Sequence, residues 1–115
     1  MNIKPSQGEI WIVRLDPVIG HEQARTRPCL VVSHNFLNHG AAGLAFVIPL
    51  TSRDKEIPYY VTIKPPEGGL LKISYVMIDQ LRVVSFLRFS QEPLGEVSVQ
   101  TLRAVQKSLC DVLGL

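Results

Sequence analysis

Short apolar runs separated by turn residues restrict this chain to a small β-rich fold. About six runs are rich in β-branched and other apolar residues, and Pro, Gly or charged residues interrupt them. Strands this short bury their faces only by closing on themselves or by packing in two layers. The pattern therefore predicts a mainly β, strongly bent small barrel. The expected strands are 8–15, 28–33, 44–50, 59–63, 71–78 and 83–89.

The period of the apolar residues changes near the end of the chain. They recur there at steps of three and four, which predicts one amphipathic C-terminal helix. Ser98 is a good N-cap, and Gly114 stands where a C-cap glycine belongs. Val97 and Leu102 are spaced to form a hydrophobic staple around the start of the helix. A short helical turn is expected at 34–40. The apolar positions of the long helix are Val99, Leu102, Val105, Leu109, Val112 and Leu113.

Length and composition indicate one folded domain over residues 1–115. Hydrophobic residues make up 46% and charged residues 19%, and the formal net charge of +2 permits contact with nucleic acid without requiring it. The first residues contain no apolar leader, and no apolar run approaches the ~18 residues of a membrane span, so a cytoplasmic protein is expected. Cys29 and Cys110 are interpreted as two buried thiols, because no spacing typical of a zinc site is present.

A polar loop is predicted between the first two strands, at 16–27. It holds His21, Glu22, Arg25 and Arg27 close together, between two strands of core character. A rigid scaffold often presents binding or catalytic groups on such a loop. The loop is therefore the first place to look for chemistry.

The same stretch resembles the opening of the MazF/PemK/Kid family of bacterial toxins. GEIW, LDP, GHEQ and TRP follow one another with the family's order and spacing, and an apolar run ending in Ser33 comes after them. Pro49 to Ser52 and Ile78 to Arg82 look like two further family blocks.

The resemblance implies a compact SH3-like barrel of the CcdB/Kid/MazF toxin type. It implies a sequence-selective, metal-independent endoribonuclease, an mRNA interferase, that cuts single-stranded RNA to a 2′,3′-cyclic phosphate and a 5′-hydroxyl. It also implies a homodimer, the toxin component of a type II system, silenced by an antitoxin segment that folds on binding. No cofactor is implied.

Arg27 and Thr51 are the leading candidates for catalysis. A guanidinium next to a core strand offers a rigid fork for a phosphate and can stabilise the extra negative charge of a phosphorane. A structural Arg paired with Glu22 or Asp16 is the alternative. Thr51, considered alone, is more typical of a local turn bond at a strand end. The resemblance instead makes it the active-site partner of the loop Arg.

Three residues are candidates for the general base: His21, Glu22 and Asp79. His titrates nearest neutrality, whereas either carboxylate needs a raised pKa or serves by orienting Arg27. Some relatives use the corresponding Asp together with an Arg two residues before it. Here that earlier position is Met77, which weakens an Asp79-centred mechanism. Asp79 is as readily a structural or interface acid.

The remaining site candidates are substrate-binding residues. Arg25 and Arg82 are suited to contact the RNA backbone or bases, Gln80 to read a base edge, and Ser52 to assist Thr51. For each of them an ordinary solvated side chain is the alternative. Trp11 in a core strand is more typical of packing than of base stacking.

Two other functions remain open at this point. One is a gyrase poison of the CcdB type, which shares the fold class, and the other is a barrel that binds RNA or protein without catalysis. A non-catalytic binder has no need of Arg27 together with Thr51. The sequence contains no dinucleotide-binding fingerprint, P-loop, nucleophile elbow or carboxylate cluster of a two-metal nuclease.

Overall fold

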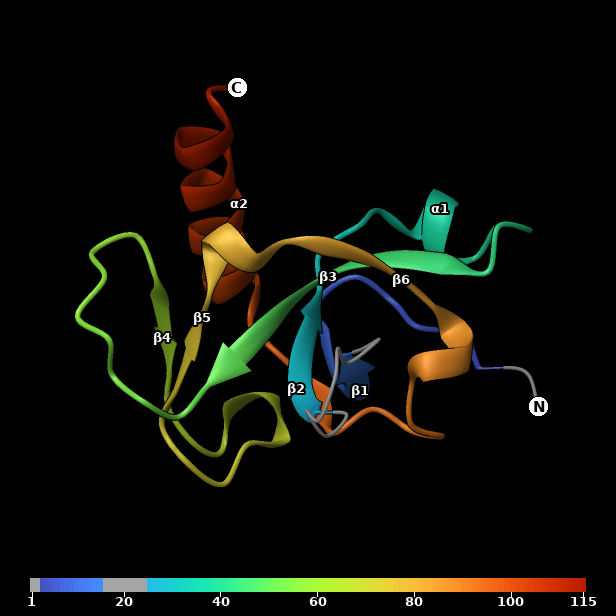
Figure 1. The fold of residues 1–115 in the computed structure, drawn as a ribbon, viewed down its shortest axis with the longest axis horizontal. Helices are drawn as coiled ribbons and strands as arrows, with labels where there is room; N and C mark the ends of the chain where they lie inside the picture. Colours follow the sequence, from blue (N-terminus) through green and yellow to red (C-terminus); the bar gives the residue numbers. More distant parts are fainter. Residues whose placement is uncertain (1–2, 16–24) are drawn as a thin grey trace, which may run out of the picture.

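The computed structural model describes residues 3–15 and 25–115, and its strands form one curled half-barrel sheet (Figure 1). This 7-stranded sheet has the order β4-β5-β3-β2-β1-β7, and β6 pairs with β3. The mainly β barrel with a C-terminal helix is thus confirmed. The elements are β1 (Glu9–Leu15), β2 (Arg25–Val31), α1 (Asn35–Asn38), β3 (Leu44–Thr51), β4 (Val61–Ile63), the 3₁₀ helix η1 (Glu67–Gly69), β5 (Ser74–Val76), η2 (Ile78–Gln80), β6 (Arg82–Ser85), η3 (Phe86–Arg88), β7 (Gly95–Glu96) and α2 (Val99–Leu113).

The central strands are buried on both faces, which explains their continuous apolar runs. Along β2, Leu30 packs into the cluster under α2, whereas Cys29 and Val31 pack into a second cluster on the opposite face. Neighbours on β3 alternate in the same way, with Ile48 on the first face and Val47 on the second. The sheet therefore carries two cores, and its strands cannot slip by one residue without exchanging them.

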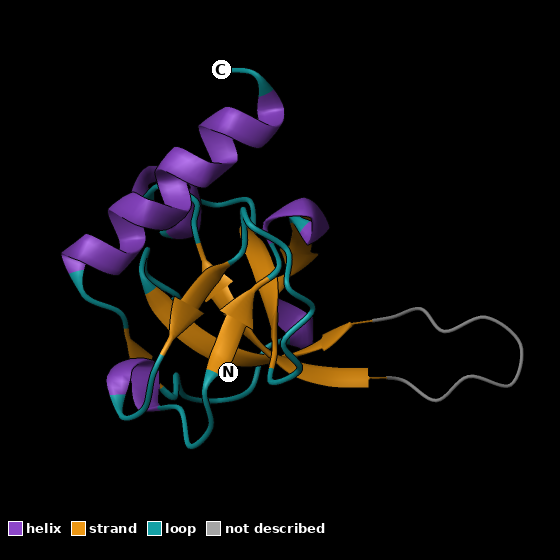
Figure 2. Ribbon diagram, turned by 90° about the vertical axis from the view of Figure 1, so that its left-hand side faces the viewer, coloured by secondary structure: helices purple, strands orange, loops and turns teal. Residues whose placement is uncertain are grey.

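Helix α2 crosses one face of the sheet and then extends beyond it (Figure 2). The predicted caps are confirmed: Ser98 Oγ accepts a hydrogen bond from the backbone N of Thr101, and Gly114 is left-handed at φ 73°. Val105 is the buried residue of this helix. Cys110 is exposed, so the prediction of two buried thiols is wrong for it, because it lies on the side of α2 away from Val105 and Leu109, which pack against the core. Among the described helices, none is long and apolar enough to cross a membrane.

Strand β2 begins earlier than predicted. Arg25, Thr26 and Arg27 were expected in the polar loop, but they continue the β1–β2 hairpin, with Leu15 opposite Arg25. Cross-strand pairing with an apolar partner strand sets this boundary, and the polar sequence gives no sign of it. His21 and Glu22 lie outside the described residues.

The later strands are shorter than predicted. β4 begins only at Val61, and 59–60 belong to the preceding turn and loop. The apolar run at 71–78 is only partly a strand, because β5 stops at Val76 and η2 follows. The run at 83–89 likewise ends in η3, and the two-residue strand β7 was not predicted.

Glycines let η1 pack directly against β7. At Gly69, φ is +72° and a Cβ would lie 2.0 Å from the carbonyl oxygen of Leu94. On the other side of the contact, a Cβ at Gly95 would lie 2.7 Å from Gly68. This backbone contact fixes the start of the segment that leads into β5.

We expect Gly69→Ala to lower the free energy of unfolding by roughly 3 kcal/mol, because left-handed strain and a clash with backbone add together. Gly43→Ala is the matched control: its φ is +68°, but nothing lies within 4 Å of the added Cβ. It should cost only about 1 kcal/mol. Urea unfolding of both variants measures the difference, and equal losses would contradict a tight η1–β7 contact.

Candidate active site

The site is built where β2 and β3 part. Cys29 and Pro49 are the last residues that pair between the two strands, and beyond them β3 pairs only on its other edge, where Leu50 lies opposite Val76 of β5. The carbonyl of Ile12 accepts from the N–H of Ser90, at 2.8 Å, so it faces away from β2. Ile12 and Pro28 therefore form a non-hydrogen-bonded antiparallel pair, which needs no N–H from the proline. A proline is tolerated inside β2 for this reason.

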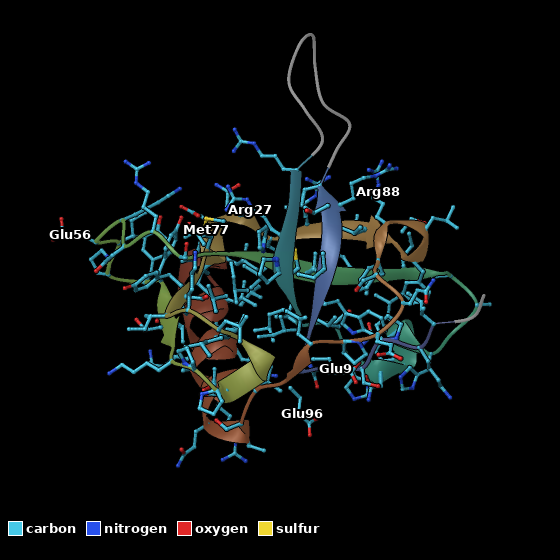
Figure 3. The ribbon with its side chains drawn as sticks, turned by 90° about the horizontal axis from the view of Figure 1, so that it is seen from below. Glu9, Arg27, Glu56, Met77, Arg88 and Glu96 are labelled. Atoms are coloured by element: carbon cyan, nitrogen blue, oxygen red, sulfur yellow. The ribbon has the colours of Figure 1, made fainter. Side chains whose placement is uncertain are left out.

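Arg25 and Arg27 project from the first half of β2 on one face of the strand. Arg27 lies opposite Val13 of β1 and is half-buried, whereas Arg25 is exposed. The backbone of Arg27 is thus held in a hairpin ladder while its side chain reaches the gap between the strands. Figure 3 places Arg27 at the hairpin, on the side of Met77, and Arg88 on its other side.

A cavity of about 560 Å³ opens at this gap. Arg27 and Thr51 both line it, which brings together the two residues predicted to be catalytic, and Arg25 and Ser52 line it as well. Thr51 is buried and its Oγ1 accepts from the backbone N of Arg53, at 3.2 Å. The local turn bond expected for a strand-end Thr is therefore present, but it uses a lone pair and not the hydroxyl proton. The other lining residues are Thr26, Pro28, Leu50, Leu70, Leu71, Lys72 and Ser74.

A second, smaller pocket of about 220 Å³ lies beside the same arginines. Arg82 and Lys55 line it together with Arg25 and Arg27, so four cationic side chains meet there. Gln80 also lines this pocket. The remaining lining residues are Leu15, Pro49 and Met77. Such a concentration of positive charge is suited to a phosphate.

Asp79 is held by two tyrosines. The hydroxyl of Tyr59 donates to Oδ2 and that of Tyr60 to Oδ1, each at 2.7 Å. These hydrogen bonds lower the pKa of Asp79 below its usual value, with the bond from Tyr59 as the largest cause. The positive charge of Lys55 adds a smaller effect in the same direction. We call the three residues the tyrosine clamp. It keeps Asp79 ionised and occupied, which argues against Asp79 as the general base.

The tyrosine clamp ties η2 to the C-terminal helix. Ser108 of α2 donates to the carbonyl of Tyr59, at 2.6 Å. Asp79 precedes Gln80, so this link also fixes the residue that lines the cationic pocket. Lys55 and the 70–72 segment line the pockets but were not singled out from the sequence. In the sequence Lys55 is one charge in a polar loop, and Leu71 and Lys72 belong to the strand expected at 71–78.

Two other sequence candidates have structural roles. Trp11 is buried, packs edge-on against Phe89 with ring centroids 5.6 Å apart and donates to Glu9, so it does not stack on bases. Burial raises the pKa of Cys29 to about 12, although Arg82 and Arg27 pull it down. Its thiol is therefore a core group and not a nucleophile.

The chain matches the family model described as "PemK-like, MazF-like toxin of type II toxin-antitoxin system" over residues 6–113. It is 32% identical to Endoribonuclease MazF9 of Mycobacterium tuberculosis, over 90% of this chain and 91% of that protein. It is 24% identical to Endoribonuclease toxin MazF of Escherichia coli, over 96% and 95% of the two chains.

The fold agrees with solved structures of the same class. The MazE-MazF crystal structure (Form-II) from Deinococcus radiodurans superposes with a TM-score of 0.82, at 31% identity and over 99% of each chain. MazF (Form-I) from that organism gives the same TM-score and identity. The chain therefore belongs to the PemK-like, MazF-like toxins of type II toxin–antitoxin systems. The family predicted from the sequence is confirmed, and both relatives named above are endoribonucleases.

The tyrosine clamp predicts a specific titration behaviour. The pKa of Tyr59 is raised chiefly by its bond to Asp79, whereas that of Tyr60 is raised to about 12 chiefly by burial. In Asp79→Asn we therefore expect the pKa of Tyr59 to fall back toward 10.0 and that of Tyr60 to stay well above it. ¹³C NMR of the tyrosine ring carbons resolves each phenol, with Tyr75 as the internal control.

The clamp's contribution to stability has two pH limits. Because the pKa of Asp79 is lowered, its contribution is present above the ordinary carboxyl pKa and is lost as the pH falls through the lowered value. The phenol contribution is present below pH 10 and is lost as the pH rises through the raised pKa values.

The NMR titration decides whether the clamp exists. If the pKa of Tyr59 is the same in Asp79→Asn as in the wild type, the clamp is refuted.

Proposed function

We propose that this protein is a metal-independent endoribonuclease that cuts single-stranded RNA, the toxin of a toxin–antitoxin pair. The observation that carries the proposal is the position of Arg27 and Thr51 on one cavity, at the gap between β2 and β3. Membership of a toxin family whose relatives are named endoribonucleases supports it.

The reaction is an internal transfer at phosphorus. The 2′-oxygen attacks the adjacent phosphate, the bond from phosphorus to the 5′-oxygen breaks, and a 2′,3′-cyclic phosphate and a 5′-hydroxyl result. Arg27 stabilises the added charge of the phosphorane with its guanidinium. The hydroxyl of Thr51 donates a hydrogen bond to a phosphate oxygen or orients the 2′-hydroxyl.

A base must take the 2′-proton, and an acid must protonate the leaving 5′-oxygen. Asp79 is unsuited to either task because its two oxygens already accept hydrogen bonds and its pKa is lowered. This leaves His21 and Glu22, which lie outside the described residues, as the candidates. His21 needs the smaller adjustment of pKa for work near neutrality.

Substrate binding falls to residues around the two pockets. Arg25 and Arg82 contact phosphates that flank the cut, and Ser52 supports Thr51 at the scissile phosphate. Gln80 reads a base edge beside the cationic pocket, and Asp79 serves it by fixing the short helix that both share. Reading base edges in this way requires unpaired bases, which supports a single-stranded substrate.

The test uses a long RNA incubated in EDTA with wild type and with Arg27→Ala. We expect discrete cuts with cyclic-phosphate ends from the wild type and about 10²-fold to 10³-fold slower cutting by the variant, the usual loss of a transition-state charge donor. Arg103→Ala, an exposed arginine of α2, is the matched control and should cut normally.

The outcomes separate the alternatives. A folded wild type that cuts no RNA would overturn the proposal and direct attention to gyrase and other protein targets. Equal cutting by Arg27→Ala and wild type would remove Arg27 from the mechanism.

We further propose a homodimer joined through the part of the α2-side face of β3 that α2 does not cover. Leu44 and Phe46 lie on the same face of β3 as buried Ile48, yet they are 37% and 41% exposed. Val83 of β6 pairs with Phe46 and is 48% exposed. The end of α2, with Leu113 exposed, extends past the sheet beside this face (Figure 1). A second copy would bury these apolar groups in a self-complementary contact.

Phe46→Glu should weaken the dimer at least tenfold, because it places a charge in the centre of an apolar contact. Leu87→Glu is the matched control, since Leu87 is 95% exposed on η3. Sedimentation velocity over a range of concentrations measures both. A dimer that is equally strong in the two variants would exclude this face.

The antitoxin is the remaining partner. Solved relatives include MazE-MazF complexes and an endoribonuclease in complex with its cognate antitoxin from Mycobacterial species. We propose that an acidic segment of a cognate antitoxin folds onto the cationic pocket and blocks the RNA site, in the cytoplasm where both partners act.

A further inference from the structure

One wall of the active-site cavity has a chemistry that phosphate binding does not use. It is formed by Leu70, Leu71, Lys72 and Ser74, at the segment that joins η1 to β5. Leu70 is buried there, but Leu71 beside it is 95% exposed. Together with Pro28 and Leu50, these residues give the cavity an apolar surface next to Arg27.

The exposed leucine stands on a fixed support. Gly69 is packed against the backbone of Leu94, as described above, and the carboxylate of Glu67 accepts from the backbone N of Ser98 at 3.0 Å. Beyond it, Ser74 is buried and donates to the carbonyl of Lys72, also at 3.0 Å. Both ends of the 70–73 segment are thus held, so Leu71 is presented to solvent at a set position on the cavity rim.

The two pockets beside Arg27 differ in what they can bind. The smaller pocket gathers Arg82 and Lys55 and is suited to a phosphate. The larger one adds apolar groups, four hydroxyl-bearing residues and a single lysine, and its volume of about 560 Å³ lies in the range of small-ligand sites. When Arg27 binds the phosphate of a nucleotide, the base of that nucleotide must lie within the length of one nucleotide from Arg27. The larger pocket offers the base an apolar face there, with Leu71 exposed, whereas the smaller one is lined mainly by charged and polar side chains.

We propose that this cavity holds one nucleobase of the RNA, the base adjoining the scissile phosphate, with Leu71 against its face and Lys72 at its edge. Unstacked bases are bound between apolar side chains in this way, with polar groups reading the edge. Lys72 and Leu71 are then specificity-determining residues on the opposite side of Arg27 from Gln80. The proposal rests on the proposed function and adds to it where the base lies.

Lys72 also restricts which base fits. An ammonium group donates hydrogen bonds and accepts none. It favours a base edge that presents carbonyl oxygens, as guanine and uracil do, over the amino group of adenine. We therefore expect guanine or uracil to be preferred at one position next to the cut.

The experiment uses a short RNA that the wild type cuts, and a set of the same RNA with the base removed at one position at a time. We expect removal at one position adjoining the cut to raise KM for the wild type about tenfold, the effect of an apolar contact of roughly 1.4 kcal/mol. Leu71→Ala should raise KM for the intact RNA by a similar factor and leave kcat little changed. For this variant, removal of the same base should raise KM almost no further.

Two matched controls accompany the variants. Leu87→Ala removes a leucine with the same 95% exposure that does not line this cavity. Lys64→Ala removes an exposed lysine from the same loop, and it should keep the base preference that Lys72→Ala reduces.

The possible failures are distinguishable. If the wild type cuts but Leu71→Ala and Leu87→Ala have the same KM on both RNAs, the base subsite is wrong and the ribonuclease stands. If the wild type cuts none of the RNAs, the proposed function itself falls. Independent, multiplicative effects of Leu71→Ala and base removal would also overturn the subsite, because the two would then not touch.

Discussion

The arrangement of the site depends on where the pairing between β2 and β3 ends. β3 pairs with β2 only as far as Pro49, whereas its last two residues pair with β5 on the opposite edge of the strand. The edge of β3 that faces β2 is therefore open beyond Pro49, and the first half of β2 is left with one free edge. A sheet edge normally invites further pairing. Here Pro28 stands on that edge without an N–H, and the strand carries arginines instead of apolar residues.

This opening also explains how a small domain keeps a polar site rigid. Cys29 to Val31 of β2 are packed between two cores, and the backbone of Arg27 continues directly from them in the ladder with β1. The cost of ordering a long arginine is thereby reduced to that of its side chain. Thr51 lies at the other margin of the opening and is positioned by the last ladder pair of β3, with Tyr75. Strand geometry thus supplies the preorganisation that charge stabilisation requires.

Met77 in place of a family arginine is accommodated by a different set of contacts. Without a neighbouring guanidinium, Asp79 is satisfied by two phenols and by the field of Lys55. Lys55 in turn lies 3.9 Å from the sulfur of Met77. Neutral donors hold the carboxylate without consuming a cation, so Arg25 and Arg27 are not needed to neutralise it. The contacts of Asp79 therefore weigh against a mechanism centred on it and are compatible with the proposed role of Arg27.

Sequence patterns captured what local physics determines and missed what distant pairing determines. The caps of α2 were predictable because Ser98 and Gly114 act within a turn of the helix. The start of β2 was not, since Arg25 to Arg27 have no strand character of their own and are extended only by pairing with β1. Leu71 was assigned to a strand because it alternates with polar neighbours, but the packing of Gly69 on Leu94 turns that segment out to the cavity rim. The position of Leu71 depends on the contact between η1 and β7, which are more than twenty residues apart in the sequence. The residues next to Leu71 in the sequence therefore carry no pattern that predicts it. The cavity of the candidate site depends on such contacts, which is why the family motifs pointed to Arg27 and Thr51 but not to Leu71 and Lys72, which line the same cavity.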